Sequence, residues 1–140
     1  LLLASDDMIP IVYGYDAFIK NAYTHTLGGD TDNVAWFNDG FQGSNLNTLS
    51  ILGKKFYDRF GYIYHPDYRS LYCDLEFTHV IRMLNRFVYF DNVIIKHKQY
   101  SIVNEQPDEL YVRNDALQSV DKQTFERRAR DNFHIQQCNK

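Results

Sequence analysis

Acidic and imidazole side chains occur at three separate points of the chain, and their types suit metal binding and proton transfer. Asp6 and Asp7 follow the apolar run "LLLAS", and adjacent carboxylates are hard oxygen ligands of the kind that Mg²⁺ and Mn²⁺ prefer. Asp74 and Glu76 lie close together in "LYCDLEF", where one carboxylate could act as a general base. His97 ends the run "NVIIKH", and a neutral imidazole can also bind Mn²⁺. These groups could hold a cation beside a proton acceptor if the fold brings them together.

An ordinary structural explanation is available at each of these points. Asp is common in the turn after a strand, because its side chain bonds to the local backbone. Asp and Glu favour the first turn of a helix, where the helix dipole and the unpaired N–H groups attract negative charge. A histidine at the end of a strand is more often a structural residue than a ligand. The residue types alone therefore leave both interpretations open.

The spacing of apolar residues, glycines and prolines predicts the elements that would position these side chains. Strands are expected at residues 1–5 (fully buried), 34–37, 48–52, 87–90 and 92–97, and helices at 11–22, within 53–61, at 71–84, 107–118 and 121–137. Asp121 is expected to cap the last helix, whose mixed charges should face solvent. Strands interspersed with helices indicate an α/β fold.

Composition and charge exclude several classes of protein. The chain has 140 residues, of which 44% are hydrophobic and 16% aromatic, so it suits one domain with a folded core. Its formal net charge of −3 gives no basic surface for binding nucleic acid through phosphates. Cys73 and Cys138 fit neither a disulfide framework nor a zinc site, which favours reduced thiols and a cytoplasmic location. No apolar run is long enough for a transmembrane segment, and no signal peptide is visible.

The order of these parts resembles the later part of the family 2-type glycosyltransferases, which have the glycosyltransferase A fold. "LLLASDDM" looks like the short acidic motif that binds the metal and the sugar-nucleotide diphosphate in that family, with Met8 where a third acid often stands. "RFGYIYHPDYRSLYCDLEFTHVIRMLNRFVYFDNVIIKH" resembles the family's glycine-containing loop, its acidic motif at a helix start and its final histidine. The resemblance covers roughly residues 1–100.

The resemblance implies a role for each motif. Asp6, Asp7 and His97 would bind the divalent cation, Mn²⁺ or Mg²⁺, and Asp74 aligns best with the catalytic base, with Glu76 as the alternative. The substrate contacts that it implies, more loosely, are Trp36, Asn38, Asp39, Gly40, Gly61, Tyr62 and Tyr64. The implied reaction is inverting transfer of a sugar from a nucleotide-sugar donor to a hydroxyl group of an acceptor, which could be a glycan, a lipid, a protein or a modified nucleotide.

The resemblance also predicts a partial domain. Residues 1–100 would form the core of a mixed, Rossmann-like sheet with flanking helices, and residues 105–140 look like the C-terminal helices of small phage or bacterial relatives. The nucleotide-binding half of the family is expected to precede Leu1. Two other functions remain open: a non-catalytic interaction module of the same fold, for example a viral one, and a metal-dependent hydrolase, although no His-Glu-x-x-His motif is present.

Overall fold

Strand β2 (Val34–Asn38) lies at the centre of the fold. The computed structural model describes residues 1–98 and 117–138, and in it β2 pairs in parallel with β3 (Phe87–Val93). Residues 34–37 of β2 are all buried, with exposed fractions of 2% or less. A run of apolar residues in a parallel strand is expected to be covered on both faces, and both faces of β2 are covered here.

The side chains of β2 alternate between two hydrophobic clusters, because successive strand residues point to opposite faces. Ala35 and Phe37 pack with Ala22 and Ile94 on the face covered by helix α1 (Tyr15–Asn21) and the π-helix η1 (Ala22–Thr26). Val34 and Trp36 pack on the other face, in a cluster with Leu52, Phe56, Phe77 and Ile81. That cluster includes residues of helix α2 (Lys54–Phe60) and helix α3 (Cys73–Leu84).

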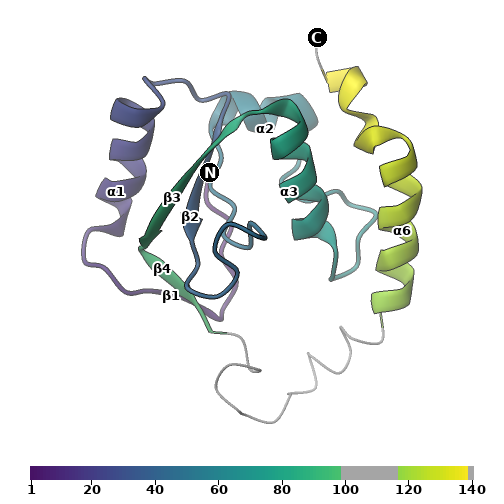
Figure 1. The fold of residues 1–140 in the computed structure, drawn as a ribbon, viewed down its shortest axis with the longest axis horizontal. Helices are drawn as coiled ribbons and strands as arrows, with labels where there is room; N and C mark the ends of the chain where they lie inside the picture. The colour runs from purple at the N-terminus through teal and green to yellow at the C-terminus, as the bar shows by residue number, and fades with distance from the viewer. Residues whose placement is uncertain (99–116, 139–140) are drawn as a thin grey trace.

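Helix α6 (Gln118–Arg130) and the following η2 (Asn132–Cys138) form an outer layer on α3. In Figure 1, α1 lies on one side of β2 and β3, α3 lies on the other side, and α6 lies beyond α3. Val80 of α3 packs with Phe125, Phe133 and Ile135 in a third hydrophobic cluster. Within the described residues, α6 packs against α3.

Two charged side chains of α6, Asp121 and Arg128, differ from the prediction that they face solvent, whereas Lys122, Glu126, Arg127 and Arg130 are exposed as expected. Leu117, not Asp121, occupies the cap position of α6, and Asp121 and Arg128 are buried, with exposed fractions of 0% and 2%. Both side chains point towards the start of α3 and the loop before it, where they find hydrogen-bond partners. Tertiary partners thus override the helix-end preference on which the prediction was based.

A second pair of strands brings the N-terminal region to the end of β4. β1 (Met8–Pro10) pairs in antiparallel fashion with β4 (Ile95–His97), so that Met8 lies opposite His97. The backbone N–H of Lys98 also donates a hydrogen bond of 2.8 Å to the carbonyl of Asp7. This register places the acidic pair beside the histidine at the end of β4.

The prediction of a fully buried strand at residues 1–5 is wrong. Leu2 forms an isolated antiparallel bridge with Ile51, and the N–H of Leu3 bonds to the carbonyl of Ser50. Leu1, Leu2 and Leu3 are nevertheless 57%, 40% and 37% exposed. The segment is extended along one neighbour, at 50–52, and the described residues do not cover its apolar side chains.

Most of the other predicted elements are present with shifted ends, but the strand predicted at 48–52 is reduced to isolated bridges at Ile51 and Leu52. The helix expected at 11–22 begins at Tyr15, because Pro10 ends β1 and Gly14 adopts a φ of 74° before the first turn. α2 ends at Gly61 as expected, with a φ of 75°. The helix predicted at 107–118 falls almost entirely outside the described residues. The described fold is mixed α/β, and none of its helices is long and apolar enough to cross a membrane.

Candidate functional site

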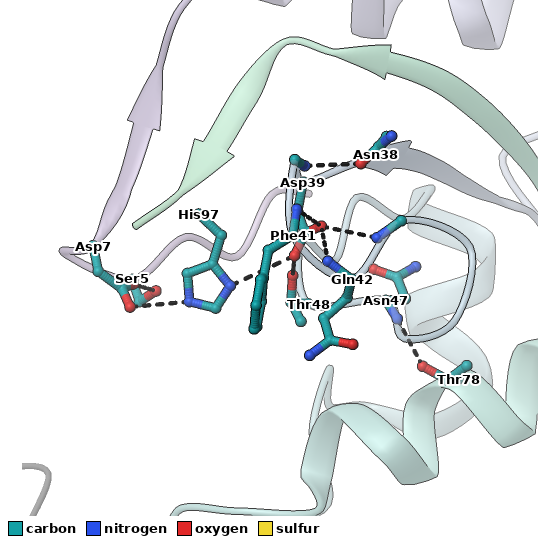
Figure 2. A network of polar contacts seen from close by, with 12 residues as sticks. Ser5, Asp7, Asn38, Asp39, Phe41, Gln42, Asn47, Thr48, Thr78 and His97 are labelled. Atoms are coloured by element: carbon teal, nitrogen blue, oxygen red, sulfur yellow. Dashed lines mark hydrogen bonds and ion pairs between the residues drawn. The ribbon is translucent and has the colours of Figure 1, made fainter. Parts of the chain in front are cut away.

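Asp7 and His97 are in direct contact. Nε2 of His97 lies 3.0 Å from Oδ2 of Asp7, and Figure 2 shows the imidazole between the Asp7 and Asp39 carboxylates. The hydroxyl of Ser5 donates a hydrogen bond to Oδ1 of Asp7, which holds the carboxylate on its other side. Both side chains are partly buried at the end of β4. The pair joins two of the three residues that were expected to bind a cation.

Asp39 lies on the other side of the imidazole. Its Oδ2 is 3.6 Å from Nδ1 of His97, which is too long for a hydrogen bond but close enough for an ion pair. Nδ1 is buried and has no hydrogen-bond partner among the described residues. The backbone carbonyl of Asp39 also accepts a hydrogen bond of 2.9 Å from the N–H of His97. Asp39 therefore limits both the position and the rotation of the imidazole.

The Asp39 carboxylate also organises the loop that follows β2. Its Oδ1 accepts hydrogen bonds from the backbone N–H groups of Phe41, Gln42 and Gly43, at 2.9, 2.7 and 3.1 Å. Its Oδ2 accepts a bond of 2.6 Å from the hydroxyl of Thr48. Asp39 is only 2% exposed, so its charge is neutralised by these donors and by His97 rather than by water.

The same loop connects His97 with the first turns of α3. The N–H of Asn47 donates a hydrogen bond of 2.9 Å to Oγ1 of Thr78, and this hydroxyl donates a bond of 2.8 Å to the carbonyl of Asp74. Phe41 is 42% exposed, and its ring meets the imidazole of His97 edge-on, with 6.3 Å between ring centroids. An exposed aromatic ring thus lies beside the Asp7–His97 pair (Figure 2).

The charges at this site shift the pKa values of its members. Burial by itself raises the pKa of Asp39, but His97, Thr48 and the backbone donors together hold it well below the usual value for aspartate. The Asp39 carboxylate raises the pKa of His97, burial lowers it, and Asp7 raises it further, so that the net shift is upward. A histidine between two carboxylates is therefore biased towards its cationic form, or towards binding another cation in place of the proton.

Asp74 has an unusual environment for an aspartate at the start of a helix. Burial raises its pKa, while the N–H of Leu75 and the charge of His97 lower it, and the net shift is upward. The N–H of Leu75, at 2.8 Å, is the side-chain hydrogen-bond partner that the structure gives to Asp74. A carboxylate with a raised pKa and few partners is suited to accepting a proton.

Glu76 is engaged in a buried ion pair. Its Oε2 and Oε1 accept hydrogen bonds of 2.7 and 2.8 Å from the guanidinium of Arg128, and the hydroxyl of Tyr68 donates a further bond of 2.7 Å to Oε2. Glu76 is 5% exposed, and the adjacent cavity has a volume of only about 20 Å³. This space is large enough for a water molecule. The geometry gives Glu76 a structural role, whereas the sequence suggested it as an alternative to Asp74 as the catalytic base.

The structure gives packing or turn-forming roles to several expected substrate contacts. Trp36 is 2% exposed in the core cluster, with the guanidinium of Arg82 over its ring at 5.3 Å. Tyr64 packs in the same cluster, and its hydroxyl accepts a hydrogen bond of 3.1 Å from Ser50. The ring of Tyr62 meets the ring of His65 at a centroid distance of 5.0 Å.

The remaining expected residues are exposed or form turns. The amide of Asn38 donates to Asp91 and accepts from the N–H of Gly40, at 3.0 and 2.8 Å. Gly40 has a φ of 75°, a conformation that favours glycine, and Gly61 has the same value at the end of α2. Asp6 is exposed and takes no part in the contact between Asp7 and His97. Asn38, Gly40 and Asp6 lie near the site in the sequence without joining its contacts.

The donors at the site fit a divalent cation as a partial ligand set. In an octahedral site with ligands at about 2.1 Å, neighbouring ligand atoms are about 3.0 Å apart, which is the spacing of Nε2 and Oδ2 here. Ligating histidines are commonly held by a carboxylate on their second ring nitrogen, which is where Asp39 lies. Within the described residues, no group of three or more His, Cys, Asp or Glu side chains is arranged to hold a metal ion. A cation would therefore need further oxygen ligands, such as phosphate and water.

Four features of the structure were not predicted from the sequence: the contacts of Thr48, Phe41 and Arg128, and the buried role of Asp39, which was expected to contact substrate. Thr48 and Phe41 flank Asp39 and His97, and neither carries a motif that distinguishes it from loop residues in general. The buried role of Asp39 has a weak signal, since Asp followed by Gly is typical of a turn in which the carboxylate binds backbone N–H groups. Nothing in the sequence indicates that Arg128 is buried, because its neighbours in the chain are polar and charged.

Comparison with protein-family models, with curated proteins and with solved structures found no match to this chain.

Proposed function

We propose that this chain carries part of the catalytic centre of a metal-dependent inverting glycosyltransferase, which moves a sugar from a nucleotide-sugar donor to a hydroxyl group. The observation that supports the proposal best is the contact of Asp7 with His97, two groups expected from the sequence to bind one cation. Asp74, whose pKa burial raises, would supply the base. Each of these features has an ordinary explanation alone, but their combination is what the reaction requires.

Each residue has a defined task in the proposed reaction. Asp7 and His97 would bind Mn²⁺ or Mg²⁺ together with the donor diphosphate, and Asp39 would keep the imidazole in position. When bound, the cation would stabilise the negative charge that develops on the departing nucleoside diphosphate. Asp74 would accept the proton of the acceptor hydroxyl as it attacks the anomeric carbon from the face opposite the leaving group. Inversion follows from this single displacement.

The proposal includes a fold and a location. The parallel pair β2–β3, covered by helices on both faces, is compatible with the later half of a glycosyltransferase A fold. A cytoplasmic location is part of the proposal because Cys73 is a free cysteine. Burial raises the pKa of this thiol to about 12, so it is unreactive at neutral pH.

The test is binding and transfer with the full natural protein. Thermal unfolding is measured with Mn²⁺ and a panel of nucleotide sugars, because a ligand that binds the folded state raises the melting temperature by mass action. Asp7→Asn and His97→Gln should abolish the increase, while Glu126→Gln, an exposed position on α6, should keep it. Transfer is then followed by NMR at the anomeric carbon, where inversion is expected. No increase with any common nucleotide sugar would contradict the proposal.

A non-catalytic interaction module is the second candidate. It is favoured by the engagement of Trp36, Tyr64 and Glu76 within the protein, where they make packing and ion-pair contacts. For such a module, Asp74→Asn would leave every activity of the polypeptide intact. Loss of sugar transfer in a folded Asp74→Asn variant would exclude it, and release of free sugar without an acceptor would instead indicate a hydrolase.

A further inference from the structure

Helix α3 begins in a conformation that it cannot stabilise by itself. Tyr72, the residue at its cap position, has a φ of 64° and provides no side-chain cap. A bulky residue in the left-handed region costs free energy, so the surrounding contacts must hold it there. Asp74 lies in the first turn directly after this residue. The direction of the Asp74 carboxylate therefore depends on what fixes the start of α3.

Asp121 of α6 holds the backbone just before α3. Its carboxylate accepts three hydrogen bonds, from the N–H groups of Arg69, Ser70 and Leu71, at 2.8, 2.8 and 2.7 Å. Asp121 is fully buried, so no water competes for these donors. A buried carboxylate bound by three N–H groups is a strong constraint, because each bond is charge-assisted. The segment before α3 is thus fixed from another helix, about 50 residues further along the chain.

Arg128 of α6 holds the first turn of α3 itself. Its guanidinium binds both carboxylate oxygens of Glu76, and the hydroxyl of Tyr68 completes the coordination of this carboxylate. The ring of Phe125, also on α6, meets the ring of Tyr72 at a centroid distance of 5.8 Å. Asp121, Phe125 and Arg128 contact the residues on both sides of Asp74, while Asp74 itself is left with the N–H of Leu75.

We infer that α6 is a positioning element for Asp74, in which Asp121 and Arg128 fix the start of α3 and so set the direction of the Asp74 carboxylate. This inference rests on the proposed function, because it assigns a task to the base of that reaction. Asp121 and Arg128 are positioning residues in this scheme, since neither is proposed to touch substrate. Arg128 and Tyr68 occupy the carboxylate of Glu76, whereas the Asp74 carboxylate accepts the N–H of Leu75.

The experiment compares Asp121→Asn with Glu126→Gln, a matched change of acid to amide at an exposed position on the same helix. An asparagine would present an NH₂ group to backbone N–H donors, so it cannot replace the three bonds. Tyr68→Phe is the milder second variant, which removes one bond to Glu76 and remains informative if Asp121→Asn does not fold. All are measured at a temperature where circular dichroism shows complete folding.

Two measurements separate positioning from stability. In ¹H–¹⁵N spectra, the amide of Leu75 should shift in Asp121→Asn and Tyr68→Phe and stay in place in Glu126→Gln, because it reports the bond to Asp74. In transfer assays, kcat should fall by about 10-fold to 100-fold in Asp121→Asn with little change in the KM of the donor, the effect of a misplaced catalytic group. Folded variants with the wild-type Leu75 amide and the wild-type kcat would overturn the inference.

The outcome also separates this inference from the proposed function. If the wild-type polypeptide transfers no sugar, the proposed function fails, and the Leu75 amide alone decides whether α6 holds the Asp74 carboxylate. A shift of the Leu75 amide signal in Asp121→Asn, with no shift in Glu126→Gln, supports the positioning role. If the Leu75 amide signal shifts in neither Asp121→Asn nor Tyr68→Phe, the positioning role is overturned. If transfer is found but kcat is unchanged in the two variants, the proposed function stands and the positioning role fails.

Discussion

Nε2 of His97 and Oδ2 of Asp7 lie 3.0 Å apart, although 90 positions separate the two residues in the sequence. The antiparallel pairing of β1 with β4 produces this contact, since Met8 lies opposite His97. On its other side, the imidazole faces Asp39, at 3.6 Å from Nδ1. The end of β4 therefore presents one imidazole between two carboxylates, and the predictions below follow from this arrangement and from the acids of α3.

The first prediction concerns the cation. Asp7→Asn and His97→Gln should each weaken the binding of Mn²⁺, measured by calorimetry, by about 10-fold or more, because each removes a direct ligand. Asp6→Asn should bind Mn²⁺ nearly as well as the wild type, since Asp6 is exposed and outside the contact. Equal weakening in Asp6→Asn and Asp7→Asn would contradict the assignment of Asp7 as the ligand.

Asp39→Asn should be strongly destabilising. The change removes a buried charge that accepts hydrogen bonds from three backbone N–H groups and from Thr48, so the unfolding free energy should fall by about 2–4 kcal/mol. Urea denaturation measures the difference. Asp91→Asn is the control, because Asp91 makes its hydrogen bonds at the surface, and it should cost less than about 1 kcal/mol.

Mutation of the two acids at the start of α3 should have different effects, one on stability and the other on transfer. Glu76→Gln leaves the buried guanidinium of Arg128 without its counter-charge and should cost about 3–5 kcal/mol of unfolding free energy. Asp74→Asn should abolish transfer while leaving the unfolding free energy at pH 7 equal to or above that of the wild type. The reason is that burial raises the pKa of Asp74, so its ionised form opposes folding at that pH. A large loss of stability in Asp74→Asn would contradict this account.

As the pH is lowered, kcat for transfer should begin to fall at a higher pH than it would if the base were an aspartate with an ordinary pKa. Asp74 acts as a base only when it is ionised, and its raised pKa means that protonation begins above about pH 4, the usual pKa of this side chain. The profile of kcat should be measured with saturating donor and Mn²⁺, so that loss of the cation does not contribute. A kcat that stays constant down to about pH 4 would exclude Asp74 as the base.

Trp36 should behave as a core residue rather than a substrate contact. Trp36→Phe removes part of a ring that is 2% exposed in the cluster between β2 and α3, and it should lower the unfolding free energy by about 1–3 kcal/mol. Its KM for the donor should equal that of the wild type, since the ring is covered. A rise in the donor KM without any loss of stability would show instead that Trp36 contacts the substrate.

Local patterns in the sequence were sufficient for much of the secondary structure and for the α/β class. The apolar run of β2, the stop of α2 at Gly61 and the amphipathic helix α3 each depend on residues that are neighbours in the chain. The same patterns singled out Asp7, His97 and Asp74, because an acid or imidazole at the end of an element is visible without knowing its partners. The sequence by itself thus determined where candidate groups stand along the chain.

Only the tertiary structure decided which of these groups share a site. The register of β1 and β4 brings Asp7 to His97 and leaves Asp6 exposed, and a shift by one residue would have exchanged them. Glu76 is engaged because α6 delivers Arg128 to it and the loop before α3 delivers Tyr68, and Asp121 is buried where the segment before α3 presents three N–H groups to it. Such partners lie tens of residues apart, and their pairing depends on long-range packing that no local pattern encodes.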